Sequence, residues 1–150
     1  SELASPRAVR GYLAAAMTNP ASDLAVVQAL LATLEGLGHA VPTRHVADPG
    51  GRAADHRLSD RQLARRDLDW LAASDAVVAE VSAPSHGVGV EVTAAAAAGT
   101  PGVLLAREDV PVSRLLLGLE GVEAHTYRTA EEAAEQVRRF LSGFPAAPGK

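Results

Sequence analysis

Short apolar runs alternate with amphipathic stretches along this chain. Five runs have the length and composition of strands: 9–16, 40–46, 75–81, 102–106 and 122–127. Apolar residues recur at helical spacing in 24–34, 59–73, 88–98 and 133–141, and 110–117 is expected to form a further short helix. This alternation predicts a single α/β domain with a doubly wound, five-stranded parallel sheet. Pro42 interrupts the second run, which is therefore expected at an edge of the sheet.

Local signals mark several helix ends. Ser59 with Gln62, and Thr129 with Glu132, have the spacing of capping boxes, in which two side chains satisfy the free N–H groups of the first turn. Gly99 follows an alanine-rich helical stretch and is expected to end it, because glycine readily adopts the left-handed conformation of a C-cap. The predicted helices therefore rest on end signals as well as on periodicity.

The stretch 79–99, AEVSAPSHGVGVEVTAAAAAG, is predicted to run from a buried strand through a tight loop into a helix. Ligands bind at such junctions in parallel sheets, and the backbone N–H groups of Ser85, His86 and Gly87 would form an anion site at the helix N-terminus. Glu91 is expected in the first turn, where the helix dipole favours its ionised form and a role as nucleophile or base. The alternative is an ordinary turn with an ordinary glutamate.

Asp67 falls on the apolar stripe of its predicted helix, four residues from both Leu63 and Leu71. An unpaired carboxylate on an inward face is costly, so its position requires a reason. Either Asp67 has a chemical role, or it pairs with one of the neighbouring arginines, Arg65 or Arg66. The pattern alone leaves both possibilities open.

Composition narrows the classes of function. The chain has 150 residues, of which 47% are hydrophobic and 21% charged, as in ordinary globular domains. A net charge of −4 and only 3% aromatic residues argue against a nucleic-acid partner. Cysteine is absent and the five histidines show no metal-ligand spacing, so no metal site is expected. With no apolar run long enough for a membrane and no signal peptide, a cytoplasmic protein without a membrane partner is expected.

The same composition allows one domain with a substantial core. We expect this domain to span residues 1–150, with its core at about 8–142 and flexible ends at 1–7 and 144–150. The polar loop 47–58 is expected to be mobile and able to cover a site.

Two motifs resemble a known family. The segments RDLDWL at 66–71 and SDAVVAEVSAPSHGVGVE at 74–91 are similar to those of 2′-deoxynucleoside 5′-monophosphate N-glycosidases, in the nucleoside 2-deoxyribosyltransferase superfamily. The first loop, YLAAAMT at 12–18, is similar to the Tyr-Leu-Ala-Gly-Pro-Met pattern of the deoxyribosyltransferases. The resemblance covers about 11–140. It implies a flavodoxin-like fold, a nucleotide or nucleoside substrate, and cleavage of the bond between nucleobase and sugar without a cofactor.

The resemblance also implies roles for particular residues. The family's nucleophile falls on Glu91, the aspartate that assists the base and the sugar hydroxyls falls on Asp67, and the tyrosine that holds the nucleophile falls on Tyr12. Further positions implied for substrate or phosphate binding are Ser85, Gly87, Gly89, His45, Ser113, Thr18 and Asn19. The residues themselves allow plainer alternatives, namely that Tyr12 packs in the core, Ser113 lies on a surface helix and 18–20 form a simple turn.

One departure from the family pattern keeps the function open. The nucleotide hydrolases usually carry a serine and an arginine in the first loop, where this chain has Ala16 and Thr18. A nucleotide N-glycosidase is the first hypothesis. A nucleoside deoxyribosyltransferase, which exchanges bases on nucleosides, and a nucleotide-binding sensor without catalysis are the alternatives, and both are favoured by the missing arginine.

The segment 110–117 contains more apolar side chains than one small domain is expected to bury. Together with the smooth alanine-rich helix after Glu91, it predicts a two-fold symmetric homodimer. In that dimer Ser113 would reach the phosphate site of the other subunit, as the resemblance implies.

Overall fold

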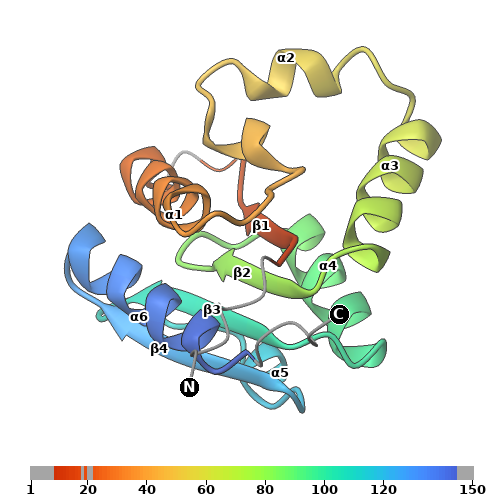
Figure 1. The fold of residues 1–150 in the computed structure, drawn as a ribbon. Helices are drawn as coiled ribbons and strands as arrows, with labels where there is room; N and C mark the ends of the chain where they lie inside the picture. The colour runs from red at the N-terminus through yellow and green to blue at the C-terminus, as the bar shows by residue number, and fades with distance from the viewer. Residues whose placement is uncertain (1–8, 18, 20–21, 145–150) are drawn as a thin grey trace, which may run out of the picture.

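A computed structural model describes residues 9–17, 19 and 22–144 of the chain. The expected flexible ends, apart from residue 144, lie outside the described residues, as does Thr18. In chain order the elements are β1 (Gly11–Ala15), α1 (Leu24–Gly36), η1 (Arg44–Ala47), α2 (Gly51–Asp55), α3 (Asp60–Ala72), β2 (Ala76–Glu80), α4 (His86–Ala97), β3 (Gly102–Arg107), α5 (Arg114–Leu117), β4 (Val122–Tyr127) and α6 (Ala130–Ser142) (Figure 1).

The described residues form a parallel sheet of four strands in the order β1-β2-β3-β4, so the prediction of five strands is wrong. The predicted second strand is reduced to an isolated bridge between Ala40 and Arg10, and the chain then turns into the 3-10 helix η1. A side chain takes the place of the missing strand pairing. The Thr43 hydroxyl accepts a hydrogen bond from Leu13 N at 3.0 Å and donates one to Leu13 O at 2.8 Å. Pro42, which has no N–H to donate, precedes this contact.

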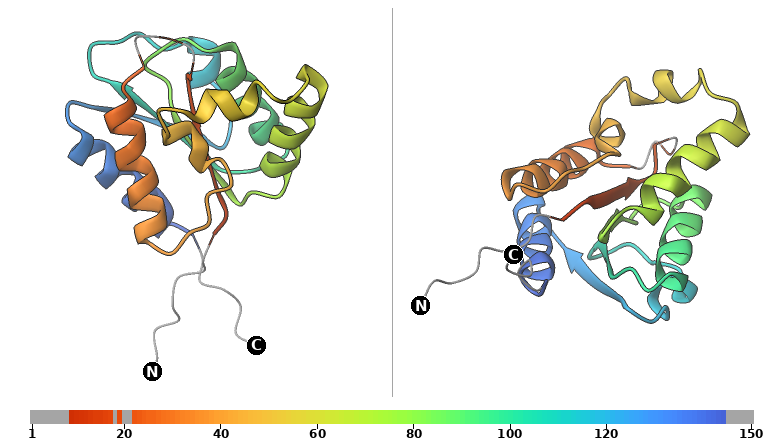
Figure 2. Two further views of the ribbon diagram at one scale, coloured as in Figure 1. Left: turned by 90° about the horizontal axis from the view of Figure 1, so that it is seen from above. Right: turned by 45° about the vertical axis from the view of Figure 1, so that its right-hand side comes forward.

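Helices cover both faces of the sheet, which confirms the doubly wound arrangement (Figure 2). On one face α1 and α6 pack against side chains such as Leu13, Val78 and Leu105. On the other face α3 and α4 pack against Tyr12, Val77 and neighbouring strand residues. The strands β1, β2 and β3 are buried on both sides, which explains their nearly continuous apolar sequences, whereas β4 is largely exposed and alternates polar and apolar residues.

Most of the predicted helix ends are confirmed. Ser59 caps α3, and both hydrogen bonds of its capping box with Gln62 are present. Thr129 caps α6 by accepting from Glu132 N, but the Glu132 carboxylate accepts from Arg128 N and so does not complete the box as predicted. Gly99 has a φ of 78°, the left-handed conformation expected after α4.

The segment 47–58, predicted to be a polar, mobile loop, contains the end of η1 and the short helix α2. Gly51 allows α2 to pack closely, because a Cβ there would stand 2.1 Å from His45 O. In the part of the chain that the structure describes, no helix has the length and apolar character needed to cross a membrane.

Candidate active site

The helix α4 begins two residues earlier than the sequence predicts. Ser85 is its N-cap, and the Ser85 hydroxyl accepts a hydrogen bond from Val88 N at 3.2 Å. Glu91 is consequently the sixth helical residue and lies in the second turn, so the expectation of a first-turn carboxylate is wrong. Because the effect of the helix dipole fades beyond the first turn, the dipole contributes little to the ionisation of Glu91.

Burial dominates the electrostatics of Glu91. It raises the pKa of this carboxyl from 4.5 to about 7, and the nearby charge of Asp67 raises it as well, while a hydrogen bond with Tyr12 lowers it. The sequence predicts a carboxylate that is held ionised, whereas the structure shows one that changes charge near neutral pH. A carboxyl with such a pKa can act either as a nucleophile when ionised or as a proton donor when protonated.

Tyr12 lies in β1 on the sheet face covered by α3 and α4, and is only 1% exposed. Burial and the neighbouring Glu91 carboxylate raise its pKa well above the usual value for tyrosine, so the phenol stays neutral. Its hydroxyl lies close enough to Glu91 for the two groups to shift each other's pKa. Tyr12 is therefore both a core residue and the direct partner of the candidate nucleophile.

Asp67, on α3, is near enough to the same pair for its charge to raise the pKa values of both Tyr12 and Glu91. It also pairs with Arg66, whose Nε and Nη2 donate to Asp67 Oδ1 at 3.0 Å and 2.9 Å. Successive residues of a helix do not normally face each other, so Arg66 must fold back along the helix to make this contact. The pairing with an arginine is therefore confirmed, with Arg66 as the partner. A chemical role for Asp67 stays a prediction.

Arg66 also pairs with Asp55, the last residue of α2, and so links α3 to the segment that contains η1 and α2. Its Nη2 donates to Asp55 Oδ1 at 2.9 Å, and its guanidinium lies 4.7 Å from the centre of the Trp70 ring. His45 Nε2 lies 3.5 Å from the same Asp55 oxygen, and the His45 ring is 6.0 Å from Trp70. His45 is thus connected to Asp67 indirectly, by the successive pairs His45–Asp55, Asp55–Arg66 and Arg66–Asp67. Sequence reasoning missed Asp55, since nothing in the polar loop distinguished it from the other charged residues.

Ser85, Gly87 and Glu91 come together at the start of α4. A Cβ placed on Gly87 would stand 3.8 Å from Glu91 Oε1 and 3.9 Å from Ser85 Oγ. The absence of a side chain at this position therefore leaves space between the hydroxyl and the carboxylate. Asn19, in the first loop, donates from Nδ2 to Pro84 O at 3.2 Å, which brings that loop against the β2–α4 loop.

A groove of about 850 Å³ lies on another face of α4, toward α5. Ser85, Gly89 and Ser113 line it together with apolar side chains that include Val90 and Leu115. Glu91, Asp67 and Tyr12 lie outside this groove. Most of the predicted residues that the structure describes thus fall into two neighbouring sets, one around Glu91 and one along the groove, and Ser85 belongs to both.

Within the described residues, no group of three or more His, Asp or Glu side chains could hold a metal ion. The groups that the site offers include two carboxyls, a neutral phenol and hydroxyl or amide donors at a helix N-terminus. This set suits nucleophilic or acid–base attack next to a bound anion.

Comparison with known proteins places this arrangement in a family. Residues 12–138 match the family model described as nucleoside 2-deoxyribosyltransferase, and the chain belongs to this family. It is 38% identical over 136 residues to a Thermofilum pendens protein with the provisional name 2′-deoxynucleoside 5′-phosphate N-hydrolase 1, which covers 88% of this chain and 94% of that protein. It is 34% identical over 141 residues to the 5-hydroxymethyl-dUMP N-hydrolase of Mus musculus, covering 89% and 80% respectively.

Solved structures agree with this placement at the level of the fold. The chain is similar to the CMP N-glycosidase BcmB of Clostridium botulinum, with a TM-score of 0.66 and 23% identity over 87% of this chain and 98% of that one. A 2-deoxyribosyltransferase from Bacillus psychrosaccharolyticus has a TM-score of 0.58 and 16% identity, over 94% and 99% of the two chains.

Proposed function

We propose that this protein is a hydrolase that cleaves the N-glycosidic bond of a ribo- or deoxyribonucleoside 5′-monophosphate, releasing the free nucleobase and the sugar 5-phosphate. The observation that carries the proposal is the contact of Glu91 with Tyr12, beside Asp67 and next to the helix N-terminus at Ser85. The family and the names of the relatives support the same reaction class.

In the proposed reaction, the ionised Glu91 attacks the anomeric carbon of the sugar. A carbon–oxygen bond forms, the bond to the base nitrogen breaks, and its electron pair leaves with the base, as in retaining glycosidases. The base takes a proton from Asp67 or from water held by it. Water then attacks the anomeric carbon of the glycosyl-enzyme, and its proton returns to Asp67 or to the hydroxide left by the bound water. The bond to Glu91 breaks with its electron pair on oxygen, which frees the sugar phosphate and restores the Glu91 carboxylate. Tyr12 keeps the nucleophile oriented through its hydrogen bond.

The phosphate would bind at the N-terminus of α4, where Ser85 and the Gly87 amide are available as donors and the helix dipole favours an anion. Asn19 and Thr18 of the first loop, Gly89 on the groove face of α4 and Ser113 would complete the surroundings of the substrate. His45 would stand on the opposite side, in the wall formed by η1 and α3.

The direct test is release of free base from a panel of common ribo- and deoxyribonucleoside monophosphates, followed by chromatography. We expect release from at least one of them. Failure to release a base from any member of the panel would contradict the proposal.

Two other functions are tested by related measurements. The residues Ala16 and Thr18, in place of the usual serine and arginine, favour a deoxyribosyltransferase that acts on nucleosides without phosphate. Base exchange between a deoxynucleoside and a second free base would support that alternative.

The missing serine and arginine also favour a sensor without catalysis. A sensor would bind the nucleotide tightly without turnover, and Glu91→Gln would bind it equally well.

The pH dependence of the reaction should identify the role of Glu91. If it is the nucleophile, kcat/KM rises with pH through an apparent pKa near 7, because the attacking carboxylate must be ionised. Tyr12→Phe removes a hydrogen bond that lowers the pKa of Glu91, so the rise should move to higher pH in this variant. A rate that falls as the pH rises through 7 would instead make Glu91 the proton donor.

The proposed enzyme is a two-fold symmetric homodimer. Leu115 on α5 is 81% exposed and Val90 on α4 is 59% exposed, and both line the apolar groove. A Cβ on Gly89 would meet nothing within 4 Å, so this glycine leaves the groove face of α4 smooth and open. An apolar surface of this kind is typical of an interface, and a second copy of α4 and α5 is the occupant we propose.

Ser113 provides the test of this dimer, because it lines the groove together with Ser85 of its own chain and would also lie near a partner's site. Ser113→Ala must first be impaired alone. Mixing it with Glu91→Ala should then restore part of the activity, since each mixed dimer contains one intact site if Ser113 acts across the interface. The absence of recovery, or a monomer at assay concentration, would contradict a shared site.

A further inference from the structure

Glu80 is a buried carboxylate to which the proposed reaction assigns no role. It is the last residue of β2 and is only 3% exposed. Burial of a charged group is costly unless hydrogen bonds compensate for the lost water. Glu80 accepts three such bonds, from Ser82 N at 2.8 Å, from Ser82 Oγ at 2.8 Å and from the Tyr127 hydroxyl at 2.5 Å.

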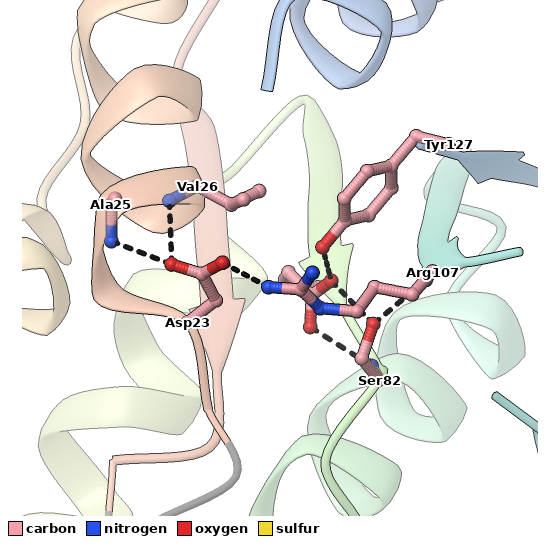
Figure 3. Close-up of polar contacts among 7 residues, drawn as sticks. Asp23, Ala25, Val26, Ser82, Arg107 and Tyr127 are labelled. Carbon is pink, nitrogen blue, oxygen red and sulfur yellow. Dashed lines mark hydrogen bonds and ion pairs between the residues drawn. The ribbon is translucent and has the colours of Figure 1, made fainter. Parts of the chain in front are cut away.

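The directions of these bonds are determined by the donors. Arg107 N donates to Ser82 Oγ at 2.8 Å, so this oxygen acts as an acceptor toward β3 and its single proton goes to Glu80. Tyr127 reaches the same carboxylate from the end of β4 (Figure 3). The carboxyl ends of β2, β3 and β4 are thus joined at the first residues of the loop that leads into α4.

The network continues to the first loop. The Arg107 guanidinium forms an ion pair with Asp23, which caps α1 by accepting from the N–H groups of Ala25 and Val26 (Figure 3). Since Asp23 ends the first loop, both loops beside the proposed anion site are tied to the Glu80 network. The contact of Asn19 with Pro84 joins the same two loops on their other side.

From these contacts we infer that Glu80 is a positioning residue for binding of the substrate's 5′-phosphate. Only Ala83 and Pro84 separate Ser82 from Ser85, so a change in the placement of Ser82 is transmitted to the α4 N-cap. Glu91 lies further along α4, in a part of the helix anchored in the core by Val88 and Val92. Loss of the network should therefore weaken phosphate binding more than it slows the chemical step. This inference rests on the proposed function.

The variant Glu80→Gln tests the inference. Glutamine keeps the size of the side chain, but its NH₂ group cannot accept a hydrogen bond, so at least one donor of the network is left facing another donor. We expect KM for a nucleoside monophosphate to rise about tenfold or more, as one lost buried hydrogen bond can cause. We expect kcat, and KM for the same nucleoside without phosphate, to change by less than about threefold. An equal rise in both KM values, or a loss in kcat alone, would overturn the inference.

A second set of variants tests the same inference independently, in case Glu80→Gln does not fold. Ser82→Ala removes the bridging hydroxyl and should raise the nucleotide KM similarly, whereas Ser82→Thr keeps the hydroxyl and should restore it. Ser74→Ala is the control, because it removes a serine hydroxyl of comparable or greater burial that donates to Trp70 O at 2.7 Å and lies before β2, outside the Glu80 network. If Ser74→Ala has the same effect on KM as Ser82→Ala, the effect is one of general stability and the inference fails.

A measurement that needs no turnover separates this inference from the proposed function. If the wild-type protein releases no base, the proposed reaction fails, but amide hydrogen exchange can still be followed in the unliganded protein. We expect exchange in 82–89 to become at least about tenfold faster in Glu80→Gln and Ser82→Ala, while α6 is unchanged. Unchanged exchange in 82–89 would overturn the positioning role itself.

Discussion

Glu91→Ala is expected to abolish base release, with a fall in kcat of about a thousandfold or more, while the protein stays folded. The proposed reaction passes through a covalent bond to this carboxylate, and alanine offers no atom that could form it. The fold should survive, because Glu91 sits within α4, where alanine is favourable for the helix. Stopped assays of base release, with circular dichroism as the check on folding, measure both effects. If more than a few per cent of the activity remains, Glu91 only positions the substrate.

Glu91→Gln is the matched control, since it keeps the shape of the side chain and an oxygen that can accept from Tyr12. The folded protein holds the Glu91 proton more tightly than the unfolded chain does, because the pKa is about 7 instead of 4.5. The stability contributed by the protonated carboxyl is therefore fully present below about pH 4.5 and is lost as the pH rises through 7. Glutamine does not lose a proton.

At pH 8 the inactive Glu91→Gln protein should consequently be more stable than the wild type, by about 1–3 kcal/mol. The difference should disappear below about pH 4.5. Denaturant unfolding at the two pH values measures it. A variant that is less stable than the wild type at pH 8 would show that the burial of Glu91 imposes no cost on the ionised form.

Asp67→Asn is the second substitution for which we expect a large effect. It should lower kcat by about a hundredfold to a thousandfold and change KM only a few-fold, as for a group that assists proton transfer mainly in the transition state. Asparagine keeps an oxygen that can accept from Arg66, so the ion-pair geometry can persist without the charge. Steady-state kinetics with a nucleoside monophosphate that the wild type cleaves separates the two parameters.

Asp55→Asn is the control for this substitution, because Asp55 accepts from the same Arg66 nitrogen, Nη2, from the opposite side. Its effect on kcat should be small, since Asp55 touches Arg66 and His45 and not the proposed nucleophile. If Asp67→Asn leaves the rate unchanged, the contact with Arg66 is the whole function of Asp67. If the two variants are equally slow, the intact ion-pair network matters more than the chemistry of Asp67.

The carboxylates illustrate how far sequence reasoning reaches in the site. Asp67 is identified from its place on an apolar helical stripe, and Glu91 from the loop and helix that precede it. The electrostatic influence of Asp67 on Glu91 and Tyr12 cannot be read from local patterns, because these residues come from α3, α4 and β1. The resemblance to a family implied that they act together, and the structure shows that they are near enough to influence one another's pKa.

The sequence by itself determined the four strands that form and the helices α1, α3, α4, α5 and α6, but not the fate of 40–46 or the helices η1 and α2. Buried strands require apolar runs, and helix ends require capping groups such as Ser59, Thr129 and Gly99. These signals depend on neighbours within a few residues, so they can be read without knowledge of the fold.

Only the tertiary structure decided the number of strands, the charge state of Glu91 and the partners of the buried Glu80. Thr43 replaces a strand pairing through Leu13, thirty residues away, and Tyr127 reaches Glu80 across forty-seven residues. The pKa of Glu91 is raised mainly by the burial that packing against other elements produces. Burial and long-range hydrogen bonds are properties of groups that meet in space, and the order of residues along the chain does not encode them locally.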